Sequence, residues 1–136
     1  MSMDESNDEL EELREKRRRE LLGDDEASGT LDEPVYVDGQ AELDAVVGDH
    51  DVVLVDFYAD WCGPCKMLEP IVADLAAETD AVVAKVDVDA NQQLAAQFGV
   101  RGVPTVVLFA GGEAVDEMVG VRDKSFYADR IEEAAA

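Results

Sequence analysis

The fold of this 136-residue chain is decided by the stretch Val55-Asp56-Phe57-Tyr58-Ala59-Asp60-Trp61-Cys62-Gly63-Pro64-Cys65-Lys66-Met67. The apolar run from Val52 to Tyr58 predicts a buried strand, and a helical pattern begins at the first cysteine. Pro64 suits the first turn of that helix, because the N–H that proline lacks would have no intrahelical partner there. The two cysteines therefore stand where a strand leads into a helix.

Cys62 and Cys65 are the only cysteines of the chain, and their spacing admits three interpretations. A structural disulfide around so small a loop would stabilise little, because it removes little entropy from the unfolded chain. A zinc site needs about four ligands. The sequence offers only His50 besides the pair, so a half-site completed by a second subunit is the one zinc site that stays open. Redox chemistry fits the context best.

The position of the two sulfurs predicts different roles for them. At a helix N-terminus the unpaired N–H groups and the helix dipole favour a thiolate at Cys62. Cys65, one turn later, is expected to point inward and to react second. We therefore expect Cys62 to be exposed and Cys65 to be buried.

Asp56 is the second informative residue. Both faces of the strand from Val52 to Tyr58 are apolar, so we expect this strand to be central and Asp56 to be buried. A buried carboxyl group has a raised pKa, which suits proton transfer at neutral pH. From the pattern alone, a hydrogen-bonded structural aspartate fits equally well. Lys85 is a candidate partner from the neighbouring strand, although by itself it would be assigned to the surface.

Strand-like and helix-like segments alternate from Pro34 onward. The predicted strands are Pro34–Asp38, Asp51–Tyr58, Ala81–Asp87, Thr105–Ala110 and Ala114–Val119, and the predicted helices are Gly39–Val47, Cys62–Thr79, Asn91–Phe98 and Lys124–Ala135. Strands separated by helices indicate parallel pairing, whereas Gly111-Gly112 between the last two strands indicates a hairpin. We predict an α/β fold with a central mixed sheet of about five strands and helices on both faces.

The chain is strongly acidic, with 33 acidic and 11 basic residues and a net charge of −22. Such a field disfavours binding to nucleic acid and to anionic membranes. Lysine is also scarce, with four residues, which favours a protein adapted to a salt-rich cytoplasm over an ordinary acidic protein. The N-terminus has no signal-peptide pattern and no apolar run is long enough for a membrane span, so we expect a soluble cytoplasmic protein.

Residues 1–33 are predicted to be a charged extension, partly helical or disordered, that precedes a domain over residues 34–136. Ser6 and Glu9 make a capping box, and Leu10, Leu13 and Leu21 share one helical face. The simplest interpretation is a marginal helix on a solvated arm. A helix that docks a partner and a basic nucleic-acid patch over residues 14–19 are the alternatives, and acidic flanks argue against the patch.

Three segments, in order, resemble the thioredoxin family, and the likeness extends across residues 34–136. They are residues 55–67, Arg101-Gly102-Val103-Pro104-Thr105 and Val119-Gly120-Val121. The resemblance implies the thioredoxin fold. One departure is Tyr58, which stands where many members carry a second tryptophan. That change would alter packing beneath the site without altering the reaction.

The resemblance also implies roles for the site residues. Cys62 would be the attacking thiolate and Cys65 the resolving thiol of a redox-active disulfide, with Asp56 and Lys85 modulating proton transfer at Cys65. It implies a cis peptide bond before Pro104, beside the sulfurs. It further implies an apolar docking surface formed by Trp61, Gly63, Pro64, Val103, Gly120 and Val121.

A protein-disulfide reductase and electron carrier is the activity that the resemblance implies. It would act on disulfide-bearing proteins through a mixed disulfide and receive electrons from a separate thioredoxin-reductase-like donor. No metal or other cofactor is implied, and we expect a monomer that binds neither nucleic acid nor membranes. Two alternatives stay open: the same fold working as an oxidase or isomerase, and a non-enzymatic subunit that binds a partner.

Overall fold

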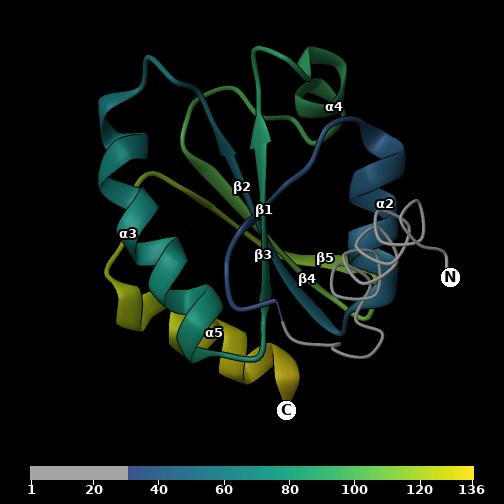
Figure 1. The fold of residues 1–136 in the computed structure, drawn as a ribbon, viewed down its shortest axis with the longest axis vertical. Helices are drawn as coiled ribbons and strands as arrows, with labels where there is room; N and C mark the ends of the chain where they lie inside the picture. The colour runs from purple at the N-terminus through teal and green to yellow at the C-terminus, as the bar shows by residue number, and fades with distance from the viewer. Residues whose placement is uncertain (1–30) are drawn as a thin grey trace, which may run out of the picture. The chain divides into compact units, whose positions relative to one another are not determined.

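A computed structural model describes residues 31–136 of the chain, and residues 32–136 form one compact unit (Figure 1). Its elements follow one another as β1 (Val35–Tyr36), α2 (Gln40–Asp49), β2 (Val52–Tyr58), α3 (Gly63–Glu78), β3 (Val82–Asp87), α4 (Gln92–Gln97), β4 (Thr105–Ala110), β5 (Glu113–Val119) and α5 (Lys124–Ala135). The predicted helical extension and the basic segment 14–19 lie outside the described residues, so the predicted division at residue 33 stays a prediction.

The strands form one five-stranded sheet in the order β1-β3-β2-β4-β5. Strand β3 pairs in parallel with both β1 and β2, whereas β4 pairs antiparallel with β2 and with β5. Helices α3 and α5 cover one side of the sheet, and α2 and α4 lie on the other (Figure 1). The predicted mixed sheet with helices on both faces is confirmed, and β2 is its central strand.

The β4–β5 connection is the predicted hairpin. Its two loop residues, Gly111 and Gly112, have φ angles of 62° and 88°. Positive φ at both loop positions matches the twist of antiparallel strands, and glycine adopts it without strain.

Element boundaries agree with the sequence prediction within one or two residues, with the first strand the most shortened. That strand pairs only with β3, through Val35 and Tyr36, because it is at the edge of the sheet. One further bond runs from the Val37 N–H to the Lys85 carbonyl at 2.9 Å. Among the described residues, no helix combines the length and apolar character needed to cross a membrane.

Strand β2 separates two packed layers because successive side chains point to opposite faces of a sheet. On the α2/α4 side, Phe57 packs against Phe98 with ring centroids 5.6 Å apart, and Phe98 packs edge-on against Phe109 at 5.8 Å. On the α3/α5 side, Val52 and Leu54 belong to a cluster with buried residues of both helices. Asp56 is two residues beyond Leu54 and therefore faces the α3/α5 side.

Candidate active site

The two cysteines stand at the start of α3. Cys62 is the N-cap residue with extended backbone angles, and Pro64 occupies the first turn. Their sulfurs are joined as a disulfide, with the Cα atoms 5.3 Å apart. The backbone N–H of Cys65 also donates to the Cys62 sulfur at 3.1 Å. An N–H at a helix N-terminus stabilises negative charge, so this contact favours a thiolate at Cys62 when the bond is reduced.

The expected difference in exposure between the two cysteines is wrong for the disulfide form. Cys62 is 3% exposed and Cys65 is 4% exposed. Both sulfurs are enclosed because a distant loop covers them: Val103 packs against this pair, and its carbonyl oxygen lies 3.7 Å from the Cys62 sulfur. Burial therefore does not distinguish Cys62 from Cys65, whereas their different positions at the start of α3 distinguish them.

The two other signature loops meet beside the disulfide. The peptide bond between Val103 and Pro104 is cis, as the resemblance implies. The N–H of Gly120 donates to the Pro104 carbonyl at 2.8 Å, which ties the end of β5 to the start of β4. Gly120 has a φ of 92°, a conformation that favours glycine.

Trp61 is the largest exposed apolar side chain next to the disulfide, with 70% of its surface exposed. It lines a pocket of about 140 Å³ together with Val103, Val88 and Arg101. Its indole N–H donates to Asp89 at 2.9 Å, so the ring is held in place while its face stays open. Gly63 and Pro64 are exposed at the start of α3. Asp89 has no sequence signal, because its contact with Trp61 spans 28 residues.

Asp56 and Lys85 are directly opposite each other in the β2–β3 register, and both are buried. The Lys85 Nζ atom lies 4.0 Å from Oδ2 of Asp56. Among the described residues, no protein group donates a hydrogen bond to either carboxyl oxygen of Asp56, and Lys85 is its charged partner. Lys85 is buried, and its predicted place beside Asp56 is confirmed.

Burial raises the pKa of Asp56 from 3.8 to about 6, against the opposing effect of the Lys85 charge. The carboxyl group thus changes charge near neutral pH, as predicted for a group that moves protons.

The Lys85 ammonium also lies over two aromatic rings, 4.6 Å from the Tyr58 centroid and 5.5 Å from the Tyr36 centroid. A second carboxylate, Glu69, comes within 4.0 Å of it. Burial raises the pKa of Tyr58 to about 12, so its ring stays neutral around Lys85. Tyr36 and Glu69 have no sequence signal, because their proximity to Lys85 depends on strand register and helix packing.

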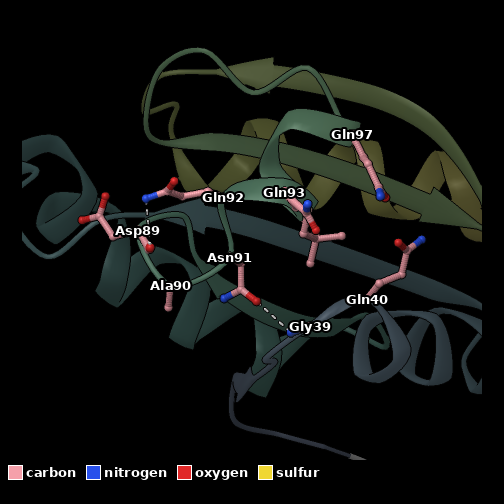
Figure 2. Close-up of a pocket in the computed structure, with 9 residues that line it drawn as sticks. Gly39, Gln40, Asp89, Ala90, Asn91, Gln92, Gln93 and Gln97 are labelled. Atoms are coloured by element: carbon pink, nitrogen blue, oxygen red, sulfur yellow. Dashed lines mark hydrogen bonds between the residues drawn. The ribbon is translucent and has the colours of Figure 1, made fainter.

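A separate polar pocket of about 400 Å³ lies between the start of α2 and the segment leading into α4. Figure 2 shows Asn91 within it, accepting the Gly39 N–H at 2.7 Å. Asn91 also donates to the Asp87 carbonyl at 3.0 Å and is buried. None of the predicted site residues lines this pocket. Asn91 therefore fastens two loops together and takes no part in the disulfide site.

Metal binding has no support in the described part of the chain, where no group of three or more His, Cys, Asp or Glu side chains is placed to hold an ion.

The family model described as Thioredoxin matches residues 34–133. A solved structure of a mutant thioredoxin from Halobacterium salinarum NRC-1 is 61% identical, with a TM-score of 0.79 over 81% of this chain and 97% of that one. Thioredoxin 2 from Chlorobaculum tepidum is 41% identical over 108 residues, 78% of this chain and 96% of its own length. A bifunctional thioredoxin reductase/thioredoxin from Mycobacterium leprae is 45% identical over 82 residues, 59% of this chain and 18% of its own.

Proposed function

The chain belongs to the thioredoxin family and is a protein-disulfide oxidoreductase that exchanges thiols through Cys62 and Cys65, and we propose that Cys62 attacks while Cys65 resolves. One observation carries this assignment. Cys62 caps α3 and its sulfur receives the Cys65 N–H at 3.1 Å. The helix N-terminus therefore stabilises negative charge at Cys62.

The first step forms a mixed disulfide. The Cys62 thiolate attacks one sulfur of a substrate disulfide, the substrate S–S bond breaks, and the leaving sulfur takes up a proton. In the second step the Cys65 thiol gives its proton to the Asp56 carboxylate. The Cys65 thiolate then attacks the Cys62 sulfur, which forms the Cys62–Cys65 bond and releases the second substrate sulfur as a thiolate, which takes up a proton from solvent. The substrate gains two electrons, and the protein loses them.

Asp56 suits the role of base in the second step. It is 1% exposed, it is without a hydrogen bond among the described residues, and its pKa is raised to about 6. A base titrating in this range is charged at neutral pH yet readily takes a proton. Lys85 opposes the effect of burial and keeps the carboxylate form populated.

The substrate surface surrounds the disulfide. We assign it to the exposed ring of Trp61, the start of α3 and the two signature loops, that is, Trp61, Gly63, Pro64, Val103, Gly120 and Val121, with the buried Pro104 supporting the Val103 backbone from below the surface. An exposed aromatic ring beside a shallow apolar pocket favours protein segments as substrates. On a chain with a net charge of −22, such a surface selects by apolar contact, and the overall charge disfavours acidic partners.

The electron donor we propose is a separate thioredoxin reductase, which returns the disulfide to the dithiol. The fusion of the two activities in the Mycobacterium leprae relative supports this pairing. No further cofactor is needed, because the redox-active disulfide itself carries the electrons. A cytoplasmic location agrees with such a cycle, since the cytosol keeps thiols reduced. We further propose a monomer in a salt-rich cell, as the acidic composition and the similarity to the Halobacterium salinarum protein suggest.

Trapping of mixed disulfides tests the division of roles. The Cys65→Ser variant should accumulate substrate bound covalently to Cys62, because the resolving thiol is missing. The Cys62→Ser variant is the matched control and should accumulate none. The reduced variants are incubated with insulin and with cell-extract proteins that carry disulfides, free thiols are rapidly alkylated, and the adducts are measured by non-reducing gels and mass spectrometry. Trapping by Cys62→Ser alone would reverse the assignment.

A further inference from the structure

The ammonium group of Lys85 lies midway between two carboxyl groups. Its Nζ atom is 4.0 Å from Oδ2 of Asp56 and 4.0 Å from Oε2 of Glu69. Both distances exceed hydrogen-bond length, so the ammonium group forms a direct hydrogen bond with neither carboxyl group. The two carboxyl groups differ in surroundings: the Asp56 side chain is 1% exposed, whereas the Glu69 side chain is 56% exposed.

Two tyrosine rings favour this shared position. The Lys85 Nζ atom lies within cation–π range of Tyr58 and of Tyr36, and the two rings meet edge to face with centroids 6.3 Å apart. The groups around the ammonium come from β1, β2 and α3, so the arrangement is held by three elements. The two rings therefore help to hold the Lys85 ammonium group in a position between Asp56 and Glu69.

A pocket of about 400 Å³ reaches Lys85 from the outside. Its lining includes Tyr36, Glu69 and Lys85, but not Asp56. Glu69 is therefore the carboxylate on the solvent side of Lys85, and Asp56 is the one on the dry side. Glu69 also follows Cys65 by four residues on α3, so the two lie on the same side of that helix.

The groups that face Asp56 come from every element packed around it. They are Lys85 on β3, Glu69 on α3, Tyr58 on its own strand and Tyr127 on α5. The Lys85 charge lowers the pKa of Asp56, and the Glu69 charge raises it. Among the described residues, Glu69 is thus the acidic side chain that raises the pKa of Asp56.

We propose that Glu69 is a positioning residue for the second step of exchange: by sharing Lys85, its carboxylate prevents full pairing of Lys85 with Asp56 and leaves Asp56 ready to accept the Cys65 proton. The proposal rests on the role of Asp56 given above. The proton passes from the Cys65 sulfur to an Asp56 oxygen, the electron pair on Cys65 forms the bond to Cys62, and the substrate thiolate leaves. Asp56 afterwards returns its proton to solvent.

A charge series at position 69 tests this role. Glu69→Gln removes the charge and Glu69→Lys reverses it, whereas Glu78→Gln removes a charge from the same helix at a residue that binds Lys124 instead. The titration of the Asp56 carboxyl carbon is followed by NMR in the reduced protein. The rate at which a preformed mixed disulfide on Cys62 releases its substrate is measured against pH in a single turnover.

The midpoint of the Asp56 titration should fall by about 0.5 pH unit in Glu69→Gln, an estimate for a charge several ångströms away at a partly solvated site. It should fall further in Glu69→Lys and stay unchanged in Glu78→Gln. The pH dependence of substrate release should move in the same direction. Molar salt should shrink the difference between the variants, because Glu69 is exposed.

An unchanged or raised midpoint in both Glu69 variants would overturn the proposal. Circular dichroism of each variant shows whether the fold is intact, and the exposed position of Glu69 makes the Gln variant a mild change. The Asp56→Asn variant separates this inference from the proposed function. If substrate release keeps its pH dependence in Asp56→Asn, the role of Asp56 fails, while the NMR titration still decides the influence of Glu69 on Asp56.

Discussion

The two faces of the seven-residue strand β2 bury different kinds of side chain. On the α2/α4 side, Val53, Val55 and Phe57 are fully buried, and the Phe57 ring packs against Phe98. On the α3/α5 side, Asp56 is equally buried and lies beside Lys85 of the neighbouring strand β3. Burial of apolar groups stabilises the fold, whereas burial of an unbonded carboxyl group costs stability. The α2/α4 face of β2 is therefore wholly apolar, whereas the α3/α5 face combines the apolar Val52 and Leu54 with a buried carboxyl group that lowers stability.

Truncation of Phe57 should break the apolar face and is the largest effect expected. Phe57→Ala removes a fully buried ring and should lower the free energy of unfolding by about 3–5 kcal/mol. Denaturant unfolding of the oxidised protein measures it. Val115→Ala, at an exposed residue of β5, is the control and should change stability by less than about 0.5 kcal/mol. A similar loss in both variants would contradict the assignment of stability to this face.

Removal of the Asp56 charge should strengthen the other face in a pH-dependent way. The folded-state pKa of about 6 is above the value of 3.8, so folding favours the protonated form, and wild-type stability falls as pH rises from about 4 to above 6. An asparagine at position 56 does not titrate, so its variant does not lose stability as the pH rises. Lys85 still has Glu69 as a charged partner in that variant. Asp56→Asn should therefore be more stable than wild type by about 3 kcal/mol at pH 8, but not at pH 3.

Unfolding curves at both pH values measure this difference, with Asp74→Asn as a control that removes the same charge from an exposed position on α3. An equal gain at pH 3 and pH 8 would show that the effect does not come from titration of Asp56.

Loss of the Asn91 amide tests a polar group on the α2/α4 side. Asn91 is expected to stabilise the fold because its amide oxygen and its amide NH2 group are both hydrogen-bonded. Asn91→Ala leaves the Gly39 N–H and the Asp87 carbonyl without their partner. We expect a loss of about 1–3 kcal/mol in unfolding free energy with activity per folded molecule unchanged. Gln92→Ala, an exposed neighbour, should have little effect. A parallel loss of reductase activity would connect this side to the chemistry after all.

Truncation of Trp61 should have the smallest effect on the fold and act on substrate docking instead. Because the ring is 70% exposed, Trp61→Ala should leave the unfolding free energy nearly unchanged. It should raise the KM for protein disulfides by several-fold, or about 1 kcal/mol, with a smaller effect on a small dithiol–disulfide substrate. Steady-state kinetics on both substrates test this. Equal effects on the two would place Trp61 in the reaction itself.

Local patterns predicted most of the fold. The two-sided apolar run of β2 predicted a central strand and a buried Asp56, since an edge or surface strand would alternate. Pro64 and the strand-to-helix change predicted that the cysteines begin α3, and Gly111-Gly112 predicted the hairpin. These predictions are correct because the periodicity or turn chemistry behind each of them is complete within a few residues. The cis bond before Pro104 came from the family resemblance, since proline alone does not reveal it.

The features that sequence reasoning missed all involve contacts between distant segments. The burial of Cys62 depends on Val103, 41 residues away, whose loop closes over the sulfur. Asp89 reaches Trp61 from the end of another strand, and Tyr36 and Glu69 reach Lys85 from β1 and α3. Residue type and spacing do not show which distant segments come into contact in the folded chain.

The sequence by itself determined the order of the elements, the place of the cysteine pair at a helix start and the burial of Asp56 in the central strand, because periodicity and helix-end chemistry are local. The tertiary structure alone decided how the charge of Lys85 is divided between Asp56 and Glu69 and how far Cys62 is covered. Strand register, helix packing and loop closure set those distances, and an electrostatic interaction between buried groups depends on distance and surroundings more than on residue identity.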